Sequence, residues 1–266
     1  MLTIEPIFQY GILLMLVAFR LGGILLMSPV VASATLPAKA KVFLVVTLAV
    51  AVFPVLNQSW HVEPSISLVT IGQLMVTETL IGAAIGFIAS IPIVAMQLGG
   101  TLMGMQMGLG LAQVFNPVVG GNSGVIDQLM FYVAVAIFIT LGGLDTMFLA
   151  VVRTYETIPL GSMTLHASPV DLLVGLMTSA YELALRVAAP VLAIMMLETI
   201  ASGVLMKTIP QINILSIGFA IKTIAGMMAL VGSLVAIQVV FEDQLRETMA
   251  VLMQWVGAGA PAVGAP

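Results

Sequence analysis

Apolar runs long enough to cross a membrane recur along the chain, and they constrain its fold more than any other feature. Hydrophobic residues make up 61% of the sequence and charged residues only 8%, whereas a soluble domain usually carries about a quarter charged residues. A membrane-spanning helix needs roughly 20 apolar residues, and several runs reach that length with few internal charges. Membrane barrel strands would be shorter and alternating in polarity. We therefore expect an all-α integral membrane protein.

The apolar pattern predicts about six kinked helical segments, arranged as hairpins in one membrane-embedded domain that covers residues 1–266. Two segments are longer than one span needs and contain Pro92 and Pro190, and proline removes a backbone hydrogen bond from a helix. The polar sequence FEDQLRE ends the last segment and begins a polar tail, about 242–266. The expected segments are 7–32, 42–56, 66–98, 125–141 (or 125–157, if the helix continues past Gly142-Gly143), 171–206 and 214–241.

The lysines indicate an orientation for these segments. Lys39, Lys41 and Lys207 lie in loops on one side of a six-span topology, and lysine-rich loops are usually cytoplasmic. This arrangement would place both termini outside.

Several classes of function lack their residues in this sequence. The chain has no cysteine, and its two histidines, His61 and His166, lie in separate connecting stretches. The His-Glu-x-x-His, Gly-x-Ser-x-Gly and phosphate-binding loop motifs are all missing from it. The net charge of −4 is scattered and forms no basic patch for nucleic acid. We therefore predict that the protein is not an enzyme and has no metal or cofactor.

Six charged side chains lie inside the apolar runs, where an unpaired charge costs several kcal/mol and usually faces protein or water. Glu182 and Arg186 are four residues apart in the favourable order for pairing on one helix face. That pair is either a structural ion pair or part of an ion path. Glu78, Glu198 and Lys222 are either a proton relay in a transporter or contacts to partner subunits, and their spacing does not pair them. Buried subunit interfaces are predicted at Arg20, Glu78, Glu182, Arg186, Glu198 and Lys222.

The uncharged stretch GGTLMGMQMGLGLAQVFNPVVGGNSG, residues 99–124, holds eight glycines and three methionines on alternate positions. If its first part were helical, Gly100, Gly104 and Gly108 would share one face and permit close helix approach. Met103 and Met107 would line a neighbouring face. Because glycine costs about 1 kcal/mol per helix position relative to alanine, the surroundings must hold such a helix together.

Two hypotheses account for this stretch. Methionine side chains fill irregular gaps and repack easily, so they would make a compliant seal beside a reentrant loop that plugs a pore. Alternatively, the methionines are ordinary filler in a glycine-packed helix. The candidate plug and gasket residues are Met103, Met105, Met107, Gly108, Gly110, Phe115, Asn116, Pro117, Gly120 and Gly121.

Four stretches together resemble the FliR family of flagellar export-gate subunits, whose injectisome counterpart is the SctT family. They are Arg20 with SPVVASATLPAKAK (28–41), FNPVVGG (115–121), TIPLG (157–161) and KTIPQINILSIGFAIK (207–222). The last is the most specific, and it departs from the family pattern at Ala220, where proline is common. Its matching residues are Lys207, Pro210, Gln211, Asn213, Gly218 and Lys222.

The resemblance implies a single copy of this subunit assembled with FliP and FliQ at the entrance of the flagellar type III secretion channel, in the inner membrane of a bacterium. It also implies FlhA and FlhB type export components and unfolded flagellar proteins as partners. In that family a plug loop lies inside the pore beside a methionine gasket, and residues 103–121 match its position. The energy source would lie in other subunits.

Three alternatives remain open. An injectisome gate would differ in cargo rather than mechanism. A secondary transporter would explain Glu78, Glu198 and Lys222, but it predicts an inverted repeat, of which Pro92 and Pro190 are only a faint trace. A structural scaffold would tolerate bulky replacements in the methionine stretch.

Overall fold

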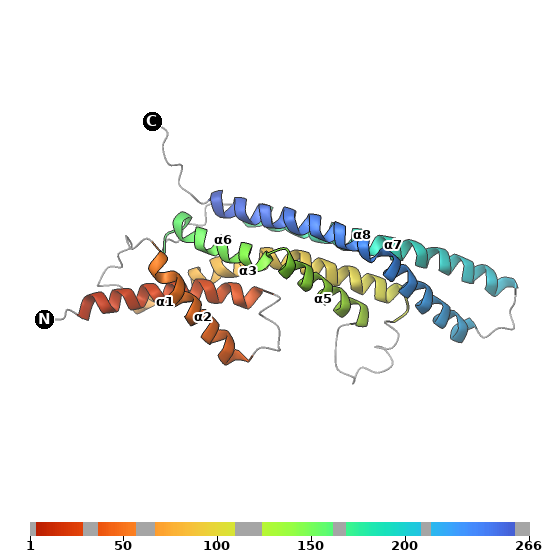
Figure 1. Cartoon of the computed structure of the whole chain (residues 1–266), viewed down its shortest axis with the longest axis horizontal. Helices are drawn as coiled ribbons and strands as arrows, with labels where there is room; N and C mark the ends of the chain where they lie inside the picture. The colour runs from red at the N-terminus through yellow and green to blue at the C-terminus, as the bar shows by residue number, and fades with distance from the viewer. Residues whose placement is uncertain are drawn as a thin grey trace, which may run out of the picture. The chain divides into compact units, whose positions relative to one another are not determined.

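The computed structural model describes residues 4–28, 37–56, 67–109, 124–161, 169–208 and 214–258. Within these ranges every regular element is a helix (Figure 1), as the apolar pattern predicts. The elements are α1 (Ile4–Met27), α2 (Ala38–Val52), the short 3₁₀ helix η1 (Phe53–Val55), α3 (Leu68–Gln106), α5 (Val125–Thr140), α6 (Gly143–Thr157), α7 (Pro169–Thr208) and α8 (Ile214–Ala258).

The chain divides into two compact units, a division that the sequence pattern alone does not reveal. The first unit contains Met1–Ser90, Gly142–Leu173 and Glu247–Pro266, and the second contains Ile91–Leu141 and Val174–Arg246. Helices α3, α7 and α8 each contribute residues to both units.

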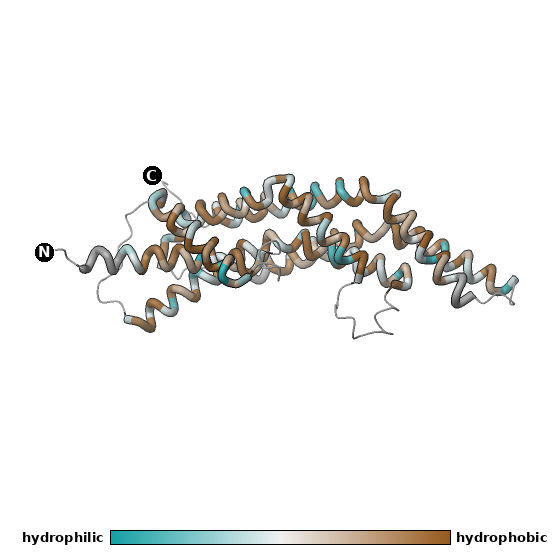
Figure 2. Tube along the Cα trace, turned by 60° about the horizontal axis from the view of Figure 1, so that its bottom comes forward, coloured by the Kyte–Doolittle hydropathy of each residue, from teal (hydrophilic) through white to brown (hydrophobic). Residues whose placement is uncertain are grey.

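Four of the described helices, α1, α3, α7 and α8, are long and apolar enough to cross a membrane, and this supports a multi-pass membrane protein. The pair α5 and α6, bent by 62°, would make a fifth span. Even with this pair the structure has five candidate spans rather than the six predicted, because α2, the remaining predicted span, has only 15 residues. At 1.5 Å per residue such a helix is about 23 Å long, against a hydrocarbon core of about 30 Å. Figure 2 shows apolar residues along all the helices, with hydrophilic residues interspersed.

The long helices continue where the sequence predicted interruptions. Helix α3 passes through Pro92 and includes the first part of the glycine-rich stretch, up to Gln106. Helix α8 does not end at 241 but continues through the polar FEDQLRE to Ala258. The reason is that its buried apolar positions continue at helical spacing beyond that point, at Leu245, Met249, Leu252 and Val256.

A glycine turn separates α5 from α6. Gly142 has a φ of +73°, in the left-handed region that glycine adopts without steric cost. The predicted segment 125–141 therefore matches α5, and the longer alternative, 125–157, is two helices rather than one.

Helices α1 and α3 cross closely in the first unit because glycines face the opposing backbone. A Cβ atom added to Gly82 would lie 1.9 Å from the carbonyl oxygen of Arg20, and one added to Gly23 would lie 2.2 Å from that of Thr79. The same helix pair buries an apolar cluster formed by Ile12, Leu16, Ile71 and Leu74. This crossing brings two intramembrane charges within reach of each other.

Candidate functional site

The methionines at the end of α3 do not share one environment. Met103 and Met107 are 0% exposed, whereas Met105 between them is 66% exposed. Gly226 of α8 makes room for Met107, since a Cβ at Gly226 would lie 2.4 Å from the Met107 Cγ. Met103 and Met107 therefore fill space in the chain's own second unit, and of the three methionines Met105 alone presents its side chain at the surface.

Two of the three glycines that were predicted to share a packing face do so, Gly100 and Gly104, whereas the prediction is wrong for Gly108, which lies beyond the last residue of α3 and near Phe219 of α8. A Cβ on Gly100 would lie 2.6 Å from the Asp127 Cα, and one on Gly104 would lie 3.6 Å from the Ile126 Cβ. Both glycines thus face α5, and Gly100 packs against backbone. This tertiary contact holds a glycine-rich segment in helical form.

Helix α3 ends in a glycine-terminated hydrogen-bond pattern. Gly108 has a φ of +81°. The Leu109 N–H donates to the Gly104 carbonyl at 3.1 Å, and the Gly108 N–H donates to the Met105 carbonyl at 3.0 Å. This pair of bonds is the Schellman arrangement, in which a left-handed residue stops the helix. Gly108 therefore ends the helix directly before the predicted plug. The remaining plug candidates lie outside the described residues: Gly110, Phe115, Asn116, Pro117, Gly120 and Gly121.

A buried polar network joins α1, α3 and α6 inside the first unit. The Arg20 Nε donates to the Glu78 Oε2 at 2.5 Å, and both side chains are fully buried. The Arg20 Nη1 donates to the Thr154 Oγ1 at 3.1 Å and its Nη2 to the Ile158 carbonyl at 3.2 Å. The second Glu78 oxygen accepts the Gly161 N–H at 3.0 Å. Each charge is thus paired and hydrogen-bonded, as a buried charge must be.

Tyr155 completes the surroundings of the arginine. The Arg20 Cζ lies 4.5 Å from the centroid of the Tyr155 ring, a cation–π distance. The Tyr155 hydroxyl donates to the Val17 carbonyl at 3.3 Å, a second link between α6 and α1. The arginine is therefore held by a carboxylate, a hydroxyl, a carbonyl and an aromatic face.

This network gives a role to a motif that sequence reasoning left without one. The TIPLG sequence supplies Ile158 and Gly161, and Gly161 has a φ of +81° that suits glycine. Sequence reasoning also missed Thr154 and Tyr155, because an uncharged side chain near the end of a helix carries no signal of its own.

The structure thus places Arg20 and Glu78 inside the chain, paired with each other, and not at a surface open to a partner subunit. The physical reason is that α1 and α3 cross closely at their glycines while Thr154 and Tyr155 of α6 cover the arginine, so neither charged side chain keeps exposed surface in this chain. A proton relay through Glu78 would have to break this ion pair, because protonation removes the negative charge of the carboxylate.

The other predicted charges lie on the second unit. Glu182 and Arg186 pair on one helix face as their spacing predicts, at 2.5 Å, and their side chains remain 55% and 59% exposed. Glu198 accepts a 2.5 Å hydrogen bond from Ser202 on its own helix, and Lys222 is partly buried.

The family motif is only partly described. Lys207 lies in the last turn of α7, where a cation is favourable, and Gly218 is half-buried in α8. Pro210, Gln211 and Asn213 lie outside the described residues. No group of three histidine, cysteine or acidic side chains capable of holding a metal occurs in the part of the chain that the structure describes.

These features define the class of the molecule, a helical multi-pass membrane protein with a glycine-terminated segment and a buried ion pair. Residues 12–248 match the family model described as Bacterial export proteins, family 1. The chain belongs to this family, and within it to the FliR family.

Relatives from distant bacteria support this membership. The chain is 26% identical to the flagellar biosynthetic protein FliR of Escherichia coli (strain K12) over 208 residues, 78% of each chain. It is 24% identical to the FliR protein of Bacillus subtilis (strain 168) over 250 residues, which cover 91% of this chain and 95% of that one. It is also 25% identical to the Yop proteins translocation protein T of Yersinia pestis over 213 residues, 79% of this chain and 76% of the other.

Proposed function

We propose that this chain is a membrane subunit of the flagellar type III protein export gate, where it helps to form and seal the pore for unfolded flagellar proteins. The family match across residues 12–248 carries this proposal. The relatives named as flagellar biosynthetic proteins cover most of the chain and come from distant bacteria. The candidate spans agree with a subunit that acts within a membrane.

The proposed assembly contains one copy of this chain with FliP and FliQ subunits in the bacterial inner membrane, and FlhA and FlhB type components act beside it. The Glu182–Arg186 pair supports an interface on the second unit. Both side chains are more than half exposed within an apolar span. Since charges that face lipid are costly, such a pair belongs against protein or water. In the proposed gate Glu198 and Lys222 lie at subunit contacts as well.

The proposed seal uses Met105 and the loop that follows α3. Met105 is the exposed methionine of the alternating set, and it lies one turn before the end of the helix at Gly108. An unbranched thioether side chain conforms to a gap that changes shape. We propose that Met105 faces the pore and that residues 110–121 supply the plug. The buried side chains of Met103 and Met107 hold the end of α3 in place by packing inside the second unit.

An in-frame deletion of the gene tests the function directly. We expect loss of extracellular flagellin and of swimming, both restored by the gene on a plasmid. Normal flagellin export in the deletion strain would contradict the flagellar assignment. Loss of effector secretion instead would favour an injectisome gate, a second candidate that the Yersinia pestis relative supports.

Alanine variants of the exposed Met105 and the buried Met103 distinguish a role in sealing the pore from a role in packing. Met105→Ala is expected to leave the assembled complex intact but to raise ion leakage across the membrane, measured as loss of membrane potential in intact cells. Met103→Ala is expected to destabilise the chain by about 2–5 kcal/mol, because it leaves a buried cavity. Met196→Ala, at a methionine of α7 with 64% exposure, is the matched control and should do neither.

Shortening residues 108–116 should likewise give an assembled but leaky gate. A series of such deletions that abolishes assembly, with no leak in any milder variant, would contradict the plug. Equal leakage from Met105→Ala and Met196→Ala would contradict the role of Met105.

A further inference from the structure

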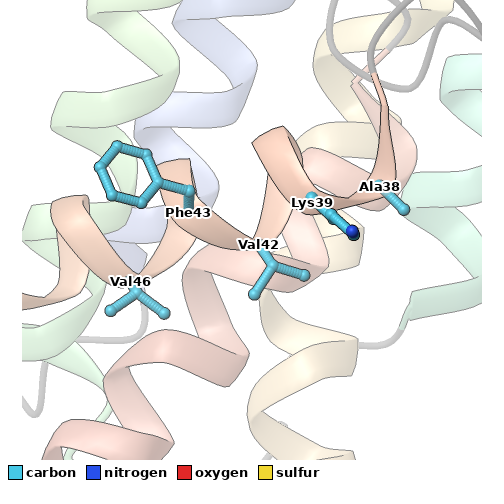
Figure 3. Close-up of a pocket in the computed structure, with 5 residues that line it drawn as sticks. All are labelled: Ala38, Lys39, Val42, Phe43 and Val46. Carbon is cyan, nitrogen blue, oxygen red and sulfur yellow. The ribbon is translucent and has the colours of Figure 1, made fainter.

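A surface depression and a buried contact both lie outside the mechanism proposed above. The depression runs along α2 and is lined by Ala38, Lys39, Val42, Phe43 and Val46 (Figure 3). All five lining residues belong to one helix, so the depression by itself does not indicate a partner. The buried contact joins α3 to α8, directly beside the methionine of the proposed seal.

The C-terminal end of α3 packs against α8 at two positions. The Met107 side chain lies over Gly226, where an added Cβ would be 2.4 Å from its Cγ, 3.0 Å from its Sδ and 3.1 Å from its Cε. The Phe219 ring packs on Gly108, since its Cε2 atom would lie 3.3 Å from a Cβ added there. Phe219 and Gly226 are seven residues apart, so they lie on the same face of α8. We call these two residues the α8 seat.

The turns of α3 before this end pack against other helices of the second unit. A Cβ on Gly99 would lie 3.0 Å from the Val187 Cγ1 of α7, and Gly100 and Gly104 face α5. The α8 seat therefore meets the end of α3, whereas α5 and α7 meet the earlier turns. Because Gly108 ends the helix, the seat contacts the point at which α3 stops.

The α8 seat fixes the rotation of this helix end about its own axis. The Met107 N–H donates to the Met103 carbonyl at 3.0 Å, so the helical turn continues to Met107. Successive residues of an α-helix are about 100° apart around the axis, so Met105 points nearly opposite to both of its methionine neighbours. Met103 and Met107 are accordingly 0% exposed and Met105 66%. Holding Met107 over Gly226 therefore turns Met105 away from α8.

We infer that Phe219 and Gly226 are the positioning residues of the proposed seal, because their contacts with Met107 and Gly108 direct the Met105 side chain outward. Gly226 leaves room for the thioether, and the Phe219 ring closes on the residue at which α3 stops. The orientation of Met105 depends on packing inside the second unit. Its effect on the pore rests on the proposed function.

Cysteine labelling measures the orientation of position 105, because the chain has no cysteine of its own. Met105→Cys is introduced into the full-length protein, which is purified in detergent and treated with a water-soluble maleimide. The labelling rate of the folded protein is divided by the rate in denaturant. A loss of stability cannot lower this rate, because unfolding only exposes the thiol further, whereas a turn of the helix end toward its neighbours does lower it.

Gly226→Ala is expected to lower the labelling rate by about threefold, the change for a thiol that is exposed about a third of the time. The added Cβ displaces Met107, and the helix end must turn with it. Combination with Met107→Ala removes the Cγ, Sδ and Cε that the new Cβ would meet, so the rate should recover. Gly232→Ala, at a glycine of α8 whose Cβ would meet nothing within 4 Å, is the matched control and should leave the rate unchanged.

Phe219→Ala tests the other half of the seat in a chain that should fold, since the ring is 42% exposed. Loss of the ring opens space beside Gly108 into which the helix end can move, so labelling at position 105 should again slow by about threefold. Phe148→Ala, at a ring of 40% exposure on α6, should have no effect. Full-rate labelling of Phe219→Ala, or of a folded Gly226→Ala chain, would overturn the inference, as would equal slowing in the control variants.

Ion leakage in intact cells separates this inference from the proposed function. Gly226→Ala and Phe219→Ala should leave the complex assembled and raise leakage, measured as loss of membrane potential, whereas Gly232→Ala should not. Slower labelling without leakage in an assembled complex would support the α8 seat and contradict Met105 as part of the seal. Labelling at the full rate would overturn the seat whatever the leakage.

Discussion

Glu78→Ala is expected to lower the free energy of unfolding of the isolated chain by about 3–5 kcal/mol, because it leaves the buried Arg20 guanidinium without its counter-ion. The same change removes the acceptor of the Gly161 N–H, so the turn after α6 loses a tether to α3. The measurement is equilibrium unfolding of the purified protein in detergent.

Glu182→Ala is the matched control for this experiment. It removes the same side chain from an ion pair of the same 2.5 Å length, but from one that is more than half exposed. Exposed pairs are worth at most about 1 kcal/mol, so the free energy of unfolding should change little. In cells, Glu182→Ala should reduce assembly of the gate more than Glu78→Ala does, since Glu182 lies on the proposed subunit interface. Equal losses of stability in the two variants would contradict the structural role of the Arg20–Glu78 pair.

Gly23→Ala is expected to destabilise the chain by about 1–3 kcal/mol or more, the cost of forcing a methyl group into a packed contact. The new Cβ would lie 2.2 Å from the Thr79 carbonyl oxygen and 2.8 Å from the Ala83 nitrogen. Both are backbone atoms of α3, so relief requires α1 and α3 to separate. Detergent unfolding measures the effect, and pairing of Arg20 with Glu78 should weaken with it.

The adjacent glycine supplies the control. A Cβ on Gly22 would meet nothing within 4 Å. Gly22→Ala should therefore stabilise α1 by up to about 1 kcal/mol through helix propensity alone. If the two variants were to change stability in the same direction by the same amount, the close crossing of α1 and α3 would be contradicted.

The methionine stretch shows how far sequence reasoning reaches. The four-residue spacing of Gly100 and Gly104 predicts a face for close packing, and both glycines do face α5. The same spacing did not decide whether the segment is a helix, because isolated glycine-rich helices are unstable and this one is packed against α5, α7 and α8. The spacing of the methionines likewise does not give the rotation of α3 about its axis, which exposes Met105 and buries Met103.

What the sequence by itself determined is the class: a helical membrane protein of the FliR family, with paired charges on α7 and glycines suited to tight crossings. Hydropathy, helical spacing and motif order are local properties, so they can be read directly from the sequence. Only the tertiary structure decided that Arg20 pairs with Glu78, a residue 58 positions away, and that the TIPLG turn closes on that pair. Long-range pairing depends on which helices cross and how each is rotated, and those angles are set by packing between segments rather than within them.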